Sequence, residues 1–448
     1  MLVVTVDTHR GIGLAQGTAL YVAAVLGTGI LLLPALAARA AGPAAIVAVV
    51  ALAVVSVPLA STFAALSTRH PDAGGVATFA RRAFGPTAAR VVGYWFFFGT
   101  PIGAPVAAIM TAQYVVAIIG GDRATVIAVA AGLVIVPAVV TVFGVRFAGW
   151  VQLLLSGALM AILVLALAAA SPHVRAGNFT PFLPHGLGGV GVAVSLYIWA
   201  FAGWEAVAGI AGEFSRPRRD IPRATALALA IVAVAYVAIQ TVVVGVLGPR
   251  VGSSDAPLLD LVSVGLGRGG GVVVACVAVI VVVGVFNAYF AAFSKLGAAM
   301  GRDGDLPAWF GRGAERGGIA RRGLLLSAAL MTVYFAVVAW LPDLQPVILV
   351  HTSLAAAIYG VGVASALVLL PRASLGWWMA ALSCLLVLGL LVLAGVNLVY
   401  PLILACAAVL VRVVARLRRG VRQTREMPAA ADAVAPAVSG SAAPASHD

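Results

Sequence analysis

The sequence predicts an all-helical integral membrane protein that crosses the bilayer about twelve times. Three observations support this fold class: 62% of the 448 residues are hydrophobic, only 10% are charged, and long apolar runs alternate with short polar stretches. Soluble globular proteins carry about 25% charged residues. Because a water-soluble fold could not cover this much apolar surface, lipid is the solvent that the composition fits.

The apolar runs have the length of membrane-spanning helices, since about 30 Å of hydrocarbon requires roughly 20 residues. Backbone in lipid must satisfy its own hydrogen bonds, which favours helices. Spans are expected at 13–38, 42–66, 91–118, 124–143, 150–170, 190–213, 224–247, 271–293, 323–341, 345–370, 376–394 and 397–415. Residues 1–12 are expected to be a cytoplasmic N-terminus, and residues 416–448, rich in Ala, Pro and Ser, a disordered cytoplasmic tail.

The basic residues predict the orientation of these spans. With the N-terminus inside, 23 of the 28 Lys and Arg residues fall in cytoplasmic segments. The five others, on the outer side, are Arg39, Arg123, Arg175, Arg250 and Arg268. The positive-inside rule then places both termini of a cell-membrane protein in the cytoplasm. The net charge of +13 is explained by these loops, so no nucleic-acid partner is expected.

Two further predictions concern a cytoplasmic loop and the three cysteines. The stretch from Asp72 to Arg90 is expected to form a short amphipathic helix on the cytoplasmic face. Cys276, Cys384 and Cys406 lie far apart within apolar runs, which indicates neither a disulfide nor a metal site. No cofactor is expected.

Two acidic residues fall inside an apolar run, both in the sixth span. Ionisable groups within a membrane are candidates for function. Glu213 lies near the inner end, where pairing with nearby Arg residues would be a purely structural role. Glu205 lies deeper and is either a structural carboxyl bonded to backbone or a protonatable gate.

Glycines interrupt the first and sixth spans at related positions. The sequence Gly27-Thr28-Gly29 breaks the first apolar run, and Phe201-Ala202-Gly203 breaks the sixth. Small residues often serve close helix packing. Paired interruptions in corresponding helices, however, are typical of a transporter's central site. Free amides at a half-helix N-terminus suit a carboxylate, and unwound carbonyls suit an ammonium, so an α-amino acid would match such a site.

Several motifs resemble those of the amino acid–polyamine–organocation (APC) superfamily. The matching stretches are 27–30 (GTGI) before Pro34, 70–76 (HPDAGGV), 201–206 (FAGWEA), 213–224 (EFSRPRRDIPRA), 294–296 (SKL) and 302–307 (RDGDLP). They occur in order over about the first two-thirds of the chain. Within the superfamily, the sequence is most similar to the bacterial amino acid efflux group, typified by a methionine and branched-chain amino acid exporter.

The resemblance implies a LeuT-type fold, a 5+5 inverted repeat in which helices 1 and 6 are discontinuous. It places the substrate carboxylate at Thr28 and Gly29, beside the flexible Gly27 and Gly203. It places the ammonium at backbone around Val25, Trp199 and Ala202. Phe201 and Trp199 would help to close the pocket, and Glu205 would be a gating acid. Some proton-coupled relatives carry a Lys in the fifth helix, but residues 150–170 contain none.

The expected function is secondary active transport of small, mostly apolar amino acids by alternating access, with proton-coupled export. H+ is the expected coupling ion, and Na+ is left open. An importer of the same fold is the first alternative, and a receptor that binds without transport is another. No catalytic motif indicates an enzyme. The expected partners are the amino acid and the lipid bilayer, and the oligomeric state is open.

Overall fold

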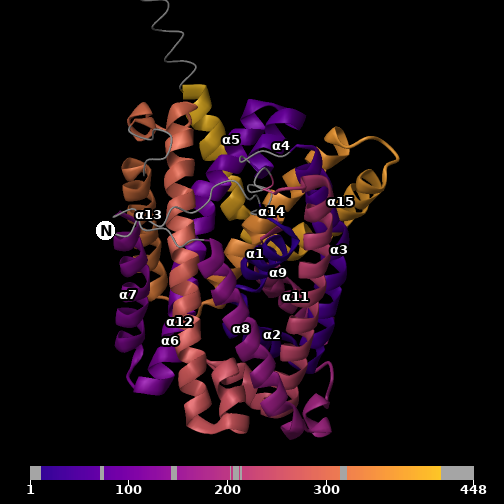
Figure 1. The fold of residues 1–448 in the computed structure, drawn as a ribbon, viewed down its shortest axis with the longest axis vertical. Helices are drawn as coiled ribbons and strands as arrows, with labels where there is room; N and C mark the ends of the chain where they lie inside the picture. The colour runs from indigo at the N-terminus through magenta and orange to yellow at the C-terminus, as the bar shows by residue number, and fades with distance from the viewer. Residues whose placement is uncertain are drawn as a thin grey trace, which may run out of the picture.

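A computed structural model describes residues 12–70, 75–142, 149–201, 203, 204, 211, 214–312 and 320–414. Over these residues the regular elements are helices, and a single isolated bridge pairs Ile12 with Phe214. Figure 1 shows the long helices running largely along the long axis of the molecule. Eight helical stretches of the described chain are long and apolar enough to cross a membrane. The prediction of an all-helical, multi-pass membrane protein is confirmed.

The first half of the chain forms eight α-helices. They are α1 (Leu14–Leu26), α2 (Gly29–Ala41), α3 (Ala45–Arg69), α4 (Gly75–Phe84), α5 (Pro86–Tyr94), α6 (Gly103–Ile119), α7 (Arg123–Val142) and α8 (Gly149–Ala170). A π-helical turn (Trp95–Gly99) and a 3-10 turn (Thr100–Ile102) join α5 to α6. Two 3-10 turns, Ser171–His173 and Ala176–Phe179, follow α8.

The second half continues the helical bundle. Its helices are α9 (Gly186–Phe201), α11 (Pro217–Leu247), α12 (Pro257–Arg302), α13 (Arg321–Ala339), α14 (Gln345–Leu369) and α15 (Leu375–Ala394), followed by helical residues 399–414. Three of the eight apolar stretches each contain two α-helices: Gly29–Arg69 holds α2 and α3, Pro86–Ile119 holds α5 and α6, and Leu375–Val414 holds α15 and residues 399–414.

The amphipathic helix expected from Asp72 to Arg90 is shorter than predicted. Within the described residues, α4 ends at Phe84, and residues 86–90 belong to the next helix, α5. Gly85 adopts a φ of +88°, which a residue with a side chain rarely adopts, and Pro86 then occupies the first turn of α5. The left-handed glycine and the proline therefore divide the segment.

A helix that the sequence analysis did not anticipate precedes the eighth predicted span. Residues 257–266 form the first part of α12, which is kinked at Gly267, where φ is +66°. Beyond this kink α12 continues to Arg302, past the predicted end at residue 293.

Tyrosine hydroxyls satisfy carbonyls where a helix is irregular. In the π-helical turn, Tyr334 Oη donates to Phe98 O at 2.6 Å. Tyr400 Oη lies 3.3 Å from the same oxygen, and Trp95 Nε1 donates to Pro401 O at 2.8 Å. An unpaired carbonyl in lipid costs several kcal/mol. These side chains therefore make the wide turn tolerable at membrane depth and tie it to α13 and to residues 399–414.

Arginines gather at the end of the bundle where α3 ends and α4 and α5 begin, here called the basic end (upper in Figure 1). Arg81 of α4 pairs with Asp303 at 3.2 Å, and Arg90 of α5 pairs with Asp305. Tyr94 Oη also donates to Asp305 O at 3.0 Å. The turn after α12 is thereby fixed to α4 and α5.

Candidate functional site

The first predicted interruption is a true break between α1 and α2. The helix α1 ends at Leu26, Gly27 takes a φ of +30°, and α2 begins at Gly29. Tyr236 of α11 donates a hydrogen bond of 2.8 Å to Leu26 O, a carbonyl at the end of α1. The first turn of α2 presents backbone N–H groups that have no preceding helical carbonyl to bond. Thr28, 8% exposed, makes no side-chain capping bond to them.

The second predicted interruption lies at the end of α9. This helix ends at Phe201, and Gly203 takes a φ of +133°. Tyr359 of α14 donates to Phe201 O at 3.2 Å. The end of α1 and the end of α9 therefore each have a carbonyl bonded to a buried tyrosine hydroxyl.

The two breaks lie against each other. A Cβ atom added to Gly203 would lie 3.1 Å from Ala24 O and 3.3 Å from Val25 Cγ2. Such contacts are tighter than real Cβ atoms normally make, and the positive φ of Gly203 already disfavours a side chain. The glycine thus permits the chain after α9 to approach the last turn of α1. Segments far apart in the sequence meet here through backbone rather than through long side chains.

An aromatic wall stands beside the first break. The indole of Trp199 extends from Gly29 to Gly103: added Cβ atoms at these glycines would lie 3.2 Å from Trp199 Cδ1 and 3.0 Å from Trp199 Cη2. His351 of α14 packs on the same indole, with ring centroids 4.5 Å apart. The imidazole Nδ1 is buried and has no hydrogen-bond partner among the described residues. The wall therefore combines apolar area with one uncommitted polar atom.

The structure brings most of the predicted site residues together. Val25, Thr28, Gly29, Trp199, Phe201 and Gly203 line or adjoin the two breaks around Gly27. Phe201 is 2% exposed, and its ring lies 5.6 Å from that of Tyr236. Ala202 and Glu205, the predicted ammonium contact and gating acid, lie outside the described residues, as does Glu213.

Sequence reasoning missed four residues of this region: Gly103, Tyr236, Tyr359 and His351. The tyrosines lie on α11 and α14 and carry no local sequence signal. A signal for His351 existed, because it is the histidine that falls within a predicted span, 345–370. The rule for ionisable residues in membranes applies to histidine as it does to acids.

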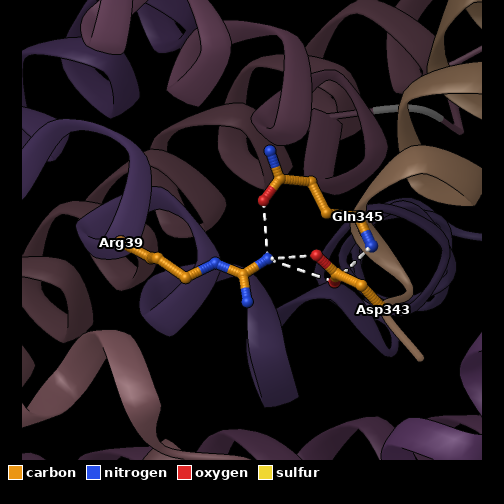
Figure 2. A network of polar contacts seen from close by, with 3 residues as sticks. All are labelled: Arg39, Asp343 and Gln345. Atoms are coloured by element: carbon orange, nitrogen blue, oxygen red, sulfur yellow. Dashed lines mark hydrogen bonds and ion pairs between the residues drawn. The ribbon is translucent and has the colours of Figure 1, made fainter.

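A polar cluster bridges α2 and the start of α14 at the end opposite the basic end. Arg39 Nη2 lies 2.9 Å from Asp343 Oδ2 and donates to Gln345 Oε1 at 2.6 Å (Figure 2). Asp343 Oδ1 also accepts from the backbone N–H of Gln345 at 3.0 Å. The side chains of Arg39 and Asp343 are 42% and 45% exposed, so this ion pair is worth at most about 1 kcal/mol. It nevertheless joins the helix that carries Gly29 to the helix that carries His351.

Comparison with known proteins identifies the family. A profile described as "Amino acid permease" matches residues 12–410. The chain is 32% identical over 402 residues to the uncharacterized amino acid permease YecA of Bacillus subtilis, covering 90% of this chain and 95% of that one. It is 34% identical over 228 residues to the L-methionine/branched-chain amino acid exporter YjeH of Escherichia coli, covering 50% and 54%.

A third relative, the branched-chain amino acid permease BcaP of Bacillus subtilis, is 26% identical over 256 residues, covering 53% of this chain and 55% of that one. Such relatives are permeases and transporters, which move solutes and are not enzymes. The resemblance seen in the sequence motifs is confirmed: the chain belongs to the amino acid permease family of the APC superfamily.

Proposed function

We propose that this protein is a secondary active transporter of small, mostly apolar amino acids, and that it exports them by alternating access coupled to protons. The observation that carries the proposal is the contact between the two breaks, where Gly203 lies against Ala24 and Val25. Where two discontinuous helices meet in the membrane, backbone N–H groups and backbone carbonyl groups are both available to a zwitterion.

The chemistry of each group of the substrate follows from the helix ends. The carboxylate is held by free N–H groups at Thr28 and Gly29, at the positive end of the α2 dipole. The ammonium is held by carbonyls around Val25, Trp199 and Ala202. The side chain packs on Trp199 and Phe201, which favours Leu, Ile, Val and Met. The names of two relatives, an exporter and a permease of branched-chain amino acids, support the same substrate class.

The proposed architecture has twelve spans arranged as a LeuT-type 5+5 inverted repeat, with α1–α2 as the first span and α9 as the outer half of the sixth. Both termini lie in the cytoplasm of a cell-membrane protein, and the basic end faces inward. A reporter active only outside the cytoplasm, fused to the C-terminus, would give no signal. A strong signal would contradict this orientation.

With this orientation, the Arg39–Asp343 cluster lies on the outer side. It ties α2 to the start of α14, and in the proposed cycle it acts as an outer gate that holds these two elements together in the outward-closed state. Opening to the outside requires Arg39 and Asp343 to separate. Because an exposed ion pair contributes little free energy, breaking it costs little, and a gate must open easily.

Coupling is assigned to Glu205. A carboxyl deep in a bilayer is costly to ionise without a partner, so binding and release of a proton there is a natural device for driving transport. The exporter among the relatives supports outward transport. An importer of the same fold would use the same site with the opposite net flux.

Counterflow in proteoliposomes tests the function. Vesicles loaded with unlabelled leucine should accumulate labelled leucine from outside, and an imposed pH gradient should drive net flux. A receptor would bind labelled leucine without accumulating it. Saturable binding without counterflow would contradict transport. If a pH gradient drives leucine only into cells and never out of them, the importer would be favoured.

A further inference from the structure

A groove on the surface of the bundle runs between α3 and α11, which lie beside α15 on the right of Figure 1. Its volume is about 720 Å³. Small side chains leave the space: Ala53, Ala60 and Ala64 on α3, and Ala226, Ala230 and Ala233 on α11. On α3 it extends from Val50 to Ala65, about 22 Å at roughly 1.5 Å per residue. This length exceeds half of a hydrocarbon core of about 30 Å, so the groove accommodates a chain from one leaflet.

A basic pocket of about 470 Å³ meets the groove at the basic end. Ala65 lines both cavities. The other residues that line the pocket are Thr68, Arg69, His70, Arg218 and Leu369. Arg218 also lies one helical turn before Pro222, which lines the groove. The apolar and the basic cavity are therefore two parts of one elongated site.

The pocket offers hydrogen-bond donors and positive charge. Among the described residues, neither Arg69 nor Arg218 belongs to an ion pair. Arg82 Nη1 lies 2.7 Å from His70 Nδ1, and because a guanidinium can only donate, Nδ1 accepts and the proton of the neutral ring is on Nε2. His70 Nε2 is buried without a hydrogen-bond partner among the described residues.

The same charges act on His70. Burial, followed by the charges of Arg82 and Arg69, lowers the pKa of His70. A histidine whose protonation is opposed by neighbouring arginines lies in a positive potential. An anion in the pocket would compensate both arginines.

We propose that this composite cavity binds an anionic phospholipid from the leaflet at the basic end, with the phosphate between Arg69 and Arg218 and one acyl chain along the groove. Basic pockets between helices at the cytoplasmic side are suited to such head groups. The continuous apolar groove favours a lipid over free phosphate. It also favours a lipid over a second copy of the chain, since that copy carries the same net charge of +13 and would bring like charge to the pocket.

Native mass spectrometry of the full protein, titrated with phosphatidylglycerol and with phosphatidylcholine of the same acyl chains, tests the site. Phosphatidylglycerol should bind more tightly. The double variant Arg69→Ala/Arg218→Ala should weaken its binding by about fivefold for each arginine. Arg219→Ala removes an exposed arginine of the same helical turn that does not line the pocket, and it should leave binding unchanged.

A second pair of variants tests the groove independently of the charge. Ala226→Phe/Ala230→Phe fills the groove and should weaken phosphatidylglycerol binding, whereas Leu227→Phe, at a 48% exposed position of α11 outside the groove, should not. Titration with inorganic phosphate distinguishes the sources: it should displace the lipid poorly. Equal binding of the two lipids, unchanged binding in both double variants, efficient displacement by phosphate, or a dimer that the filled groove abolishes would each overturn the proposal.

Discussion

Tyr236 donates its hydroxyl proton to the carbonyl of Leu26 at 2.8 Å, and this contact ties α11 to the point where the first helix breaks. The same hydroxyl closes the space beside Gly29, since a Cβ added there would lie 2.8 Å from Tyr236 Oη. A bare glycine and a tyrosine hydroxyl therefore define one side of the break together.

Gly29→Val is expected to weaken substrate binding by about ten- to a hundredfold. The added side chain collides with Tyr236 Oη and Trp199 Cδ1 and pushes the carboxylate away from the α2 amides. Loss of a charge-assisted hydrogen bond costs about 1.5–3 kcal/mol. The matched control is Gly132→Val on α7, where an added Cβ meets nothing within 4 Å. Equilibrium binding of labelled leucine measures the difference.

A rescue variant separates the collision from general misfolding. Gly29→Ala alone should bind poorly, and Gly29→Ala/Tyr236→Phe should recover part of the affinity, because removal of the hydroxyl relieves the nearest contact. Tyr236→Phe alone should lower stability by about 1 kcal/mol through the lost hydrogen bond. Wild-type affinity in a well-folded Gly29→Val protein would remove Gly29 from the site.

His351 should set the shape of the pocket through its contact with Trp199. His351→Ala is expected to lower affinity up to about tenfold, since an aromatic pair contributes about 0.5–1.5 kcal/mol. His351→Phe keeps a ring against the indole and should retain most of the substrate affinity. His185→Ala, at an exposed histidine outside the bundle interior, serves as the control. An equal loss of affinity in His351→Ala and His351→Phe would instead assign the effect to the imidazole nitrogens.

The Arg39–Asp343 pair is expected to act on transport rate more than on stability. Arg39→Ala and Asp343→Ala should each change the counterflow rate by up to about fivefold, and the double variant should resemble either single variant. Arg250→Ala, another exposed arginine at the same end, should have no effect. Additive effects of the two substitutions would show that the pair does not work as one gate.

Glu205→Gln should retain substrate binding and exchange but lose the dependence of net transport on a pH gradient. Glutamine keeps the size and much of the hydrogen bonding of the carboxyl but cannot ionise. Glu213→Gln, the matched control in the same predicted span, should remain coupled. Unchanged pH-driven flux in Glu205→Gln would reduce Glu205 to a structural hydrogen-bonding group.

The length of the apolar runs predicted the helices, because a membrane leaves the backbone few alternatives. The two breaks could also be predicted, since Gly27 and Gly203 adopt backbone angles that glycine tolerates. What the sequence could not predict was tertiary contact. Nothing near Tyr236 or Tyr359 indicates that their hydroxyls reach Leu26 and Phe201, and nothing near Gly103 indicates that Trp199 packs on it.

The amphipathic helix was predicted too long for a local reason. Its apolar pattern was read through Gly85-Pro86, a pair that ends one helix and starts the next. The groove between α3 and α11 could not be predicted because it depends on tertiary structure. Its alanines resemble ordinary packing residues in the sequence, and only the packing of the two helices next to the basic pocket makes them a groove.

Competition in counterflow tests the central claim, that the two breaks form an amino acid site, most directly. Wild-type proteoliposomes should exchange labelled leucine, and Leu, Ile, Val and Met should compete far better than Arg, Lys or Glu. Gly29→Val should strongly reduce this exchange while Gly132→Val preserves it. Preferred competition by Arg, or undiminished exchange in Gly29→Val, would contradict the account.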